Sequence, residues 1–173
     1  TNLSIAYEKI GRLDDAVERQ EQAIEILLGA HGDGHDLVAT ARMNLAYLER
    51  ARRNYPRSLA LYRQALENIS DVSRGLALLG SGESHLLLGG VGPAARMFEE
   101  AERFLEDKPP GLGSRGEALY LLAQCRWMQG RRSEARALAT EAVEVLREEE
   151  DDEVRGEVEA WLQNPGPYAS GER

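Results

Sequence analysis

The chain has 173 residues, of which 30 are acidic and 21 are basic, and its formal charge at neutral pH is −9. This balance disfavours a nucleic-acid partner, because phosphate recognition needs concentrated positive charge. No apolar run approaches the roughly 20 residues that cross a bilayer, no signal peptide is recognisable, and a lone cysteine excludes an intrachain disulfide, so we expect a cytoplasmic protein without a membrane partner.

The N-terminal stretch predicts two helices separated by a glycine. Apolar residues at i, i+3, i+4 and i+7 within segment 2–10 predict an amphipathic helix, which Gly11 ends. Asp14 is the expected N-cap of a second helix that runs to about Leu28. Segment 29–35 contains three glycines and therefore predicts a loop.

The next four predicted helices form two pairs. Asp36, and then Ser70 or Asp71, are the expected N-caps of the first helix in each pair. Pro56 and Pro93 open the second helices, because the N–H that proline lacks has no helical partner in a first turn. The expected helix ends are Arg52, Ile69 and the proline-rich segment 108–111.

The C-terminal third predicts three further helices. Ser114 and Glu117 form a capping box for the seventh helix, and Ser133 is the expected cap of the eighth. Six consecutive acids at 148–153 would be unfavourable at a helix C-terminus but favourable at the start of a ninth helix. An acidic interaction tail is the alternative, but an apolar stripe with helical spacing follows at once. The last expected segments are a capping helix over 151–163 and a flexible tail over 164–173.

A pattern of small residues recurs four times along these helices. The turn residues that align are Gly11, Arg53, Gly89 and Gly130. They are separated by 42, 36 and 41 residues, and alanine-rich columns follow five and 12 residues later. Such a period predicts an all-α, right-handed solenoid of four helix pairs with a C-terminal capping helix. If the backbone at Arg53 is left-handed, as glycine in this column allows, the turn there is strained by about 1 to 2 kcal/mol. The four units span about 1–35, 36–70, 71–112 and 113–150.

The order of residues within each unit resembles the tetratricopeptide repeat. In the first unit it is carried by Leu3, Ser4, Tyr7, Gly11, Ala16 and Ala23, and in the fourth by Leu122, Ala123, Gly130, Ala135 and Ala142. The stretch from Leu28 to Ala46 resembles the subtype of about 42 residues typified by kinesin light chains and abundant in bacterial signalling proteins. The resemblance implies a non-catalytic scaffold that binds a protein or peptide, as a fragment of a larger bacterial signalling or regulatory protein.

In this family the first helix of each pair lines a concave groove, so the non-core faces of those helices are candidate ligand contacts. Amides and aromatic side chains there suit a peptide backbone and its side chains. The candidate groove residues are Asn2, Asn44, Tyr47, Arg50, Glu83, Tyr120, Gln124 and Trp127. The alternative interpretation is that Tyr120 and Trp127 only pack against adjacent helices.

The sequence predicts no catalytic residue, cofactor or metal site. His31, His35, Asp33 and Asp36 have superficial metal-site spacing, but they lie in the glycine-rich connector, which favours a solvated loop. Cys125 has no evident activating histidine. The competing functional hypothesis is a regulatory or self-association arm of a multidomain enzyme such as a Ser/Thr kinase.

The start of the sequence gives one further expectation. Residue 1 falls inside the first predicted helix, without the preceding turn that the later units have. We therefore expect the chain to be cut from a longer protein and its leading face to be partly apolar. That face would contact preceding repeats or pair with a second copy as a homodimer.

Overall fold

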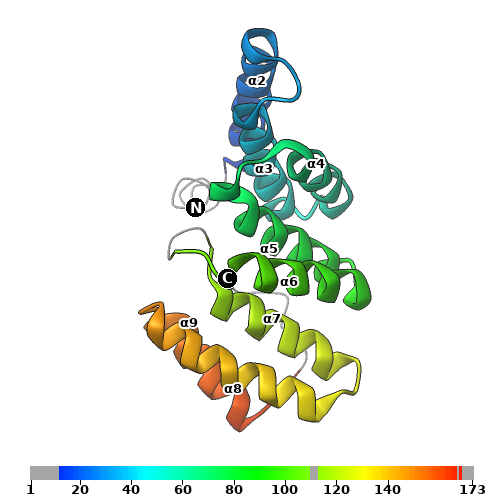
Figure 1. Cartoon of the computed structure of the whole chain (residues 1–173). Helices are drawn as coiled ribbons and strands as arrows, with labels where there is room; N and C mark the ends of the chain where they lie inside the picture. The colour runs from blue at the N-terminus through cyan, green and yellow to red at the C-terminus, as the bar shows by residue number, and fades with distance from the viewer. Residues whose placement is uncertain (1–11, 110–112, 167, 169–173) are drawn as a thin grey trace. The chain divides into compact units, whose positions relative to one another are not determined.

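The computed structural model describes residues 12–109, 113–166 and 168, and these residues form helices without any strand (Figure 1). The helices are α2 (Leu13–His31), α3 (Asp36–Ala51), α4 (Tyr55–Asn68), α5 (Asp71–Leu87), α6 (Val91–Leu105), α7 (Arg115–Met128), α8 (Arg132–Glu148) and α9 (Asp152–Gln163). The predicted helix over 2–10, Gly11 and most of the predicted tail lie outside the described residues. The all-α prediction is confirmed for the described part of the chain.

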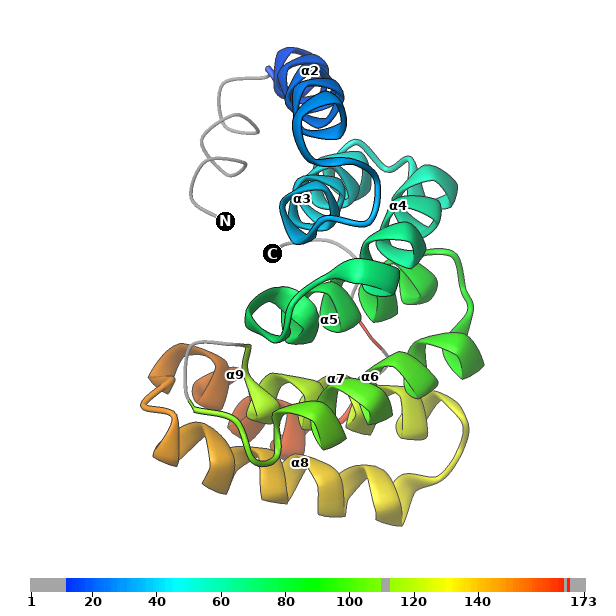
Figure 2. The same cartoon turned by 45° about the horizontal axis from the view of Figure 1, so that its top comes forward.

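The chain divides into two compact units, residues 1–84 (unit 1) and residues 85–173 (unit 2). In unit 1, α2 packs on α3 and α3 packs on α4. In unit 2, α6 packs on α7, α7 on α8, and α8 on α9, the capping helix. Figure 2 shows α7 and α8 side by side and running in opposite directions, as expected for a helix pair joined by a short turn. None of the described helices is long and apolar enough to span a membrane.

Small residues lie where helices cross closely. The buried members of the two alanine columns are Ala16, Ala94 and Ala135, and Ala65, Ala101 and Ala142. Ser58 takes the alanine place in the second repeat, and its hydroxyl donates a hydrogen bond of 2.8 Å to the carbonyl oxygen of Ala46. A small side chain at these positions lets two helices approach, and the larger apolar residues then fill the space beside the crossing.

One predicted cap and the predicted start of the ninth helix are confirmed. The Ser114 hydroxyl accepts a hydrogen bond from the N–H of Glu117 at 2.9 Å and caps α7. An Asp151 carboxylate oxygen accepts from the N–H of Val154 at 3.0 Å and caps α9, so the acidic run does open a ninth helix. Its apolar face packs into the core of unit 2 through Val154, Val158, Trp161 and Leu162.

Three other predicted caps are wrong. Asp14 and Ser133 lie inside the first turns of α2 and α8, which begin earlier without a side-chain cap. Asp36 is also inside its helix, and the His35 ring accepts from the N–H of Leu37 at 3.1 Å instead. An acid in a first turn is still stabilised by the helix dipole, so composition alone does not separate the cap from the turn. The Asp36 carboxylate accepts from the N–H of Ser70 at 2.6 Å, just before α5.

The three described residues of the turn column have a left-handed backbone. The φ angle is 63° at Arg53, 77° at Gly89 and 79° at Gly130. Glu150, between α8 and α9, has a φ of 58°, which the sequence did not indicate. A left-handed residue with a side chain costs about 1 to 2 kcal/mol, so Arg53 strains its turn.

Arg53→Gly is expected to leave the free energy of unfolding unchanged or raise it by up to about 1 kcal/mol. Glycine relieves the strain, and the gain is partly offset by the greater conformational freedom of glycine in the unfolded chain. Arg53 is exposed, so little packing is lost. Urea denaturation measures the change. Arg63→Gly, at an exposed site within α4, is the control and should cost about 1 kcal/mol. If both variants lowered the free energy of unfolding equally, the proposed backbone strain at Arg53 would be contradicted.

Candidate functional site

Several predicted groove residues meet in unit 1, on one face of α3 and α5. The Arg50 guanidinium pairs with the carboxylate of Glu83, joining side chains 33 residues apart in the sequence. The same guanidinium carbon lies 5.1 Å from the centroid of the Tyr47 ring, a cation–π contact. Asn44 lies one turn before Tyr47 and is exposed. Tyr47, Arg50 and Glu83 therefore lie together, and the nearby Asn44 is open to solvent.

Two exposed leucines extend this surface. Leu37 is 46% exposed and Leu76 is 47% exposed. Each lies seven residues, or two helical turns, before a predicted groove residue on the same helix: Leu37 before Asn44, and Leu76 before Glu83. We call the surface formed by Leu37, Asn44, Tyr47, Arg50, Leu76 and Glu83 the α3–α5 face. Sequence reasoning missed the leucines because their type alone suggests core positions.

A buried tyrosine packs against α5, one of the two helices that form the α3–α5 face. Tyr62 of α4 is 2% exposed, and burial raises the pKa of its hydroxyl to about 12 despite the opposing charge of Arg50. Its ring abuts α5 at Gly80, where a Cβ atom would lie 2.2 Å from the Tyr62 hydroxyl oxygen. The lack of a side chain at Gly80 thus allows α4 and α5 to pack closely, which fixes the helix that carries Leu76 and Glu83.

The candidate residues of unit 2 are placed differently. Tyr120 and Gln124 are each 4% exposed. The rings of Tyr120 and Trp127 lie edge-on to Trp161 of α9, with centroids 6.1 and 5.6 Å apart. Two guanidinium groups cover the Trp127 ring, that of Arg132 at 5.1 Å and that of Arg136 at 6.0 Å. These side chains pack against adjacent helices, as the alternative interpretation held. Asn2 lies outside the described residues.

Gln124 differs from its neighbours because its side chain is polar. Its Oε1 atom is buried and has no hydrogen-bond partner among the residues that the structure describes. A buried acceptor left unpaired costs about 1 to 3 kcal/mol. Helical spacing showed which side of α7 Gln124 occupies, but not that this side is closed.

A buried charged residue on the first helix of a pair forms an ion pair with the second helix in each unit. The buried residue is acidic in unit 1 and basic in unit 2. In unit 1, Glu49 of α3 is fully buried, and Arg57 of α4 approaches it to 2.9 Å while also pairing with Glu21 of α2. The hydrogen bond to Glu21 and the negative charges of Glu21 and Glu49 together raise the pKa of Arg57 despite its partial desolvation. Arg57 therefore carries its positive charge at neutral pH.

In unit 2 the arginine is on the first helix of the pair. Arg126 of α7 donates from Nε to Glu134 of α8 at 2.8 Å and also pairs with Glu99 of α6. Glu49 and Arg57 are separated by eight residues, as are Arg126 and Glu134. Arg126 thereby joins α7 to both α6 and α8.

The potentially reactive groups are committed to structural contacts. Cys125 is fully buried, and burial raises the pKa of its thiol to about 12 although the neighbouring Arg126 opposes the shift. The rings of His31 and His35 lie 4.5 Å apart, and Asp33 pairs with Arg42. No cluster of three or more histidine, cysteine or carboxylate side chains suited to a metal occurs in residues 12–109, 113–166 and 168.

Antiparallel helix pairs with small residues at their crossings and left-handed turns define an α-helical repeat protein. The sequence of residues 1–71 matches the tetratricopeptide repeat family. This match covers the first part of the chain, and the described helices have the paired, all-α fold of such repeats. No curated protein matches the sequence.

Solved structures share the fold. Nearly identical TPR-like repeats assigned to a kinesin light chain of Podosopora anserina give a TM-score of 0.73 at 18% identity, over 93% of this chain and 81% of theirs. BtubC (BKLC) from P. vanneervenii gives 0.72 at 22% identity, over 99% and 66%. MamA gives 0.60 at 12% identity, over 94% and 92%. At these identities the likeness shows the fold alone.

Proposed function

We propose that this chain is a non-catalytic interaction module that binds a peptide segment of a partner protein on the α3–α5 face. The observation that carries the proposal is the pairing of Arg50 with Glu83 beside Tyr47. These side chains are held in place before any ligand arrives, which lowers the entropy lost on binding. We further propose that the module serves a cytoplasmic signalling or regulatory protein.

The chemistry of this face suits a peptide. The Asn44 amide has both a donor and an acceptor, as a peptide bond does. Leu37 and Leu76 offer exposed apolar surface for side chains of the partner. We leave Tyr120, Gln124 and Trp127 out of the binding face, because α9 already packs against the two rings and Gln124 is buried.

Asn44→Ala combined with Leu76→Ala is expected to weaken peptide binding at least about tenfold, because an amide contact and an apolar anchor are lost together. Peptides of 12 residues are first selected from a random phage library on the unmodified protein, and their Kd values are then measured by calorimetry. Both substituted side chains are exposed, so folding should be unaffected.

Arg63→Ala combined with Gln64→Ala is the matched control, since both residues are exposed on α4 away from the face. This pair should change the Kd less than about twofold. The same Kd for the face variant and the control variant would rule out the α3–α5 face as the binding site. A library that yields no binding peptide would count against the proposed function itself.

A further inference from the structure

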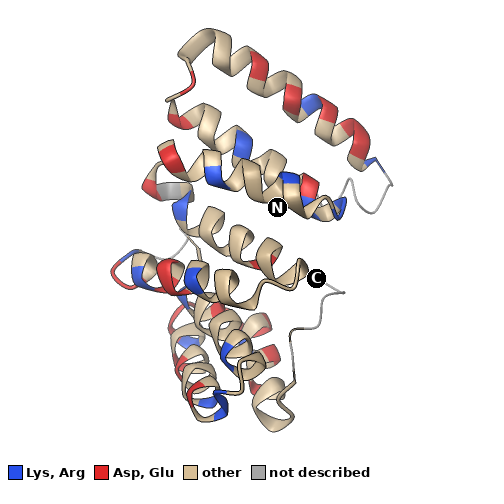
Figure 3. Ribbon diagram, turned by 90° about the vertical axis from the view of Figure 1, so that its right-hand side faces the viewer, with Lys and Arg blue, Asp and Glu red and all other residues tan. Residues whose placement is uncertain are grey.

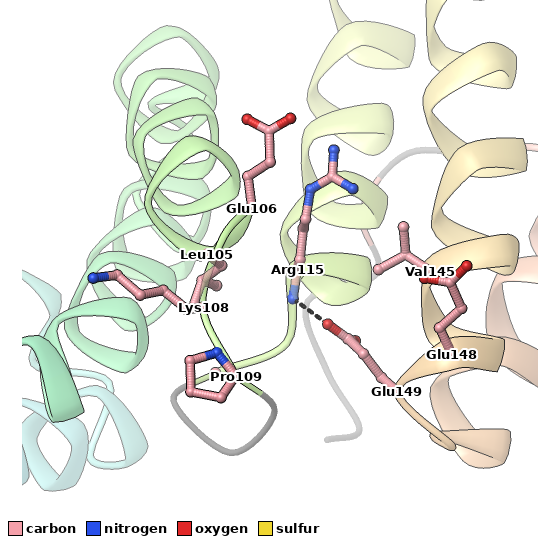
Figure 4. A pocket seen from close by; sticks show the side chains of 9 residues that line it. Leu105, Glu106, Lys108, Pro109, Arg115, Val145, Glu148 and Glu149 are labelled. Carbon is pink, nitrogen blue, oxygen red and sulfur yellow. Dashed lines mark hydrogen bonds between the residues drawn. The ribbon is translucent and has the colours of Figure 1, made fainter.

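A cavity of about 290 Å³ lies on unit 2, where the end of α6 and the start of α7 face the end of α8 (Figure 4). Its apolar lining includes Leu105, which is buried, and Val145, which is half-buried. Pockets for drug-sized ligands measure about 300 to 1,000 Å³, so this one is at the lower limit. It suits a single long side chain better than a cofactor.

Two of the charged residues that line the cavity, Glu149 and Arg115, already form hydrogen bonds or ion pairs with other residues. One carboxylate oxygen of Glu149 accepts from the N–H of Arg115 at 2.9 Å, and the other accepts from the Ser114 hydroxyl at 2.6 Å. The Arg115 guanidinium bridges Glu102 at 2.7 Å and Glu141 at 2.9 Å. Glu149 therefore holds the N-terminus of α7, and Arg115 is neutralised by carboxylates outside the cavity.

Two other carboxylates at the cavity have no such role. Glu106 and Glu148 are exposed and form no hydrogen bond or ion pair within the described part of the chain. Lys108 extends away from Glu148 in Figure 4, and its ammonium nitrogen lies 4.9 Å from the centroid of the Phe104 ring. The cavity thus combines an apolar floor with two carboxylates that lack a cation.

The surrounding charge favours the approach of a cation. Unit 1 contains 12 acidic and 10 basic residues, whereas unit 2 contains 18 and 11, so unit 2 accounts for −7 of the formal charge of −9. Five consecutive acids, residues 149–153, directly follow α8. Figure 3 shows the acidic residues in red and the basic residues in blue over the helices of both units. A field of this sign raises the local concentration of cationic segments.

We propose that this cavity binds a lysine or arginine side chain carried on a basic segment of a partner protein. The aliphatic stem of that side chain packs against Leu105 and Val145, as long basic side chains do on apolar surfaces. Its charged end forms a charge-assisted hydrogen bond with the carboxylate of Glu106 or of Glu148, which lie on opposite sides of Arg115 in Figure 4. This site is separate from the α3–α5 face, and its occupation does not depend on peptide binding there.

The probe is a fluorescein-labelled peptide, Gly-Ser-Arg-Lys-Arg-Ser-Gly, with an analogue in which norleucine replaces all three basic residues. Norleucine keeps the aliphatic stem and removes the charge. Fluorescence anisotropy should show binding of the basic peptide only. Glu106→Gln combined with Glu148→Gln should weaken that binding about tenfold, because neither carboxylate can then pair with the basic side chain.

Glu150→Gln combined with Glu153→Gln removes the same charge from exposed residues outside the cavity and is the matched control. It should weaken binding less than about threefold, through the long-range field alone. Equal weakening by the two variants would overturn the proposal, since only a diffuse acidic surface would then act. Equal binding of the norleucine analogue, or no binding up to about 1 mM peptide, would overturn it too. Asn44→Ala with Leu76→Ala should leave this binding unchanged, which separates the cavity from the α3–α5 face.

Discussion

Gly116→Ala is expected to lower the free energy of unfolding by about 1 to 3 kcal/mol. A Cβ atom at this position of α7 would lie 2.3 Å from Cγ of Leu146 and 3.2 Å from its backbone nitrogen. Leu146 is fully buried on α8, and no rotamer change moves a backbone atom. The two helices would have to separate. This overpacking outweighs the roughly 1 kcal/mol by which alanine favours a helix over glycine.

Gly156 of α9 supplies the control, because no atom lies within 4 Å of a Cβ built there. Gly156→Ala should raise the free energy of unfolding by about 0.5 to 1 kcal/mol, so the two glycines respond with opposite signs. Urea denaturation followed by circular dichroism measures both. Combining Gly116→Ala with Leu146→Ala should cost less than the sum of the single losses, since the second change removes the clashing atoms. If Gly116→Ala stabilised the protein as Gly156→Ala does, the close crossing of α7 and α8 would be wrong.

The repeat period predicted most of what the backbone does. Equivalent turns of neighbouring repeats have the same backbone conformation. Arg53 is therefore left-handed, as Gly89 and Gly130 are, although a residue with a side chain disfavours that conformation. Alanines spaced two turns apart indicated the close crossings, because only small residues fit there. These inferences succeed because neighbouring units repeat one local geometry, so the sequence states the same requirement several times.

Helix starts were less predictable, since several polar residues near each start compete for one role. Asp14 and Ser133 are good caps by type, yet α2 and α8 start earlier and place both residues within the first turn. His35 caps α3 although histidine is uncommon in this role. The choice depends on backbone angles one or two residues away, which residue type alone does not specify.

The exposure of the candidate residues was predictable only where no other described helix packs on them. Helical spacing placed Tyr47 on an open side of α3, and by the same logic placed Trp127 on the corresponding side of α7. Trp161 of α9 occupies the latter position, and it is 34 residues further along the chain. Periodicity shows which side of a helix a residue is on, whereas its burial depends on a distant element. The cavity beside Glu106 and Glu148 has the same origin, since it forms between segments far apart in the sequence.

Glu49→Ala is expected to lower the free energy of unfolding by about 2 to 4 kcal/mol. The carboxylate of Glu49 is fully buried and accepts from the side-chain amide of Asn54 at 3.0 Å. Arg57 lies 2.9 Å away and is 45% exposed, so water can solvate part of the charge that remains. That exposure keeps the expected loss below the 3 to 5 kcal/mol or so for breaking a fully buried pair.

Two further variants separate charge from packing at Glu49. Glu49→Gln keeps an oxygen that can accept from Asn54 but removes the charge facing Arg57, so it should lose about 1 to 2 kcal/mol. Glu67→Ala, at an exposed site on α4, should change the free energy of unfolding by less than about 0.5 kcal/mol. If Glu49→Ala proved as mild as Glu67→Ala, the buried carboxylate would not hold α3 to α4. If Glu49→Gln lowered the free energy of unfolding as much as Glu49→Ala, the negative charge of Glu49 rather than its hydrogen bond to Asn54 would hold α3 to α4. We would then expect the corresponding pair of Arg126 and Glu134 in unit 2 to depend on charge in the same way.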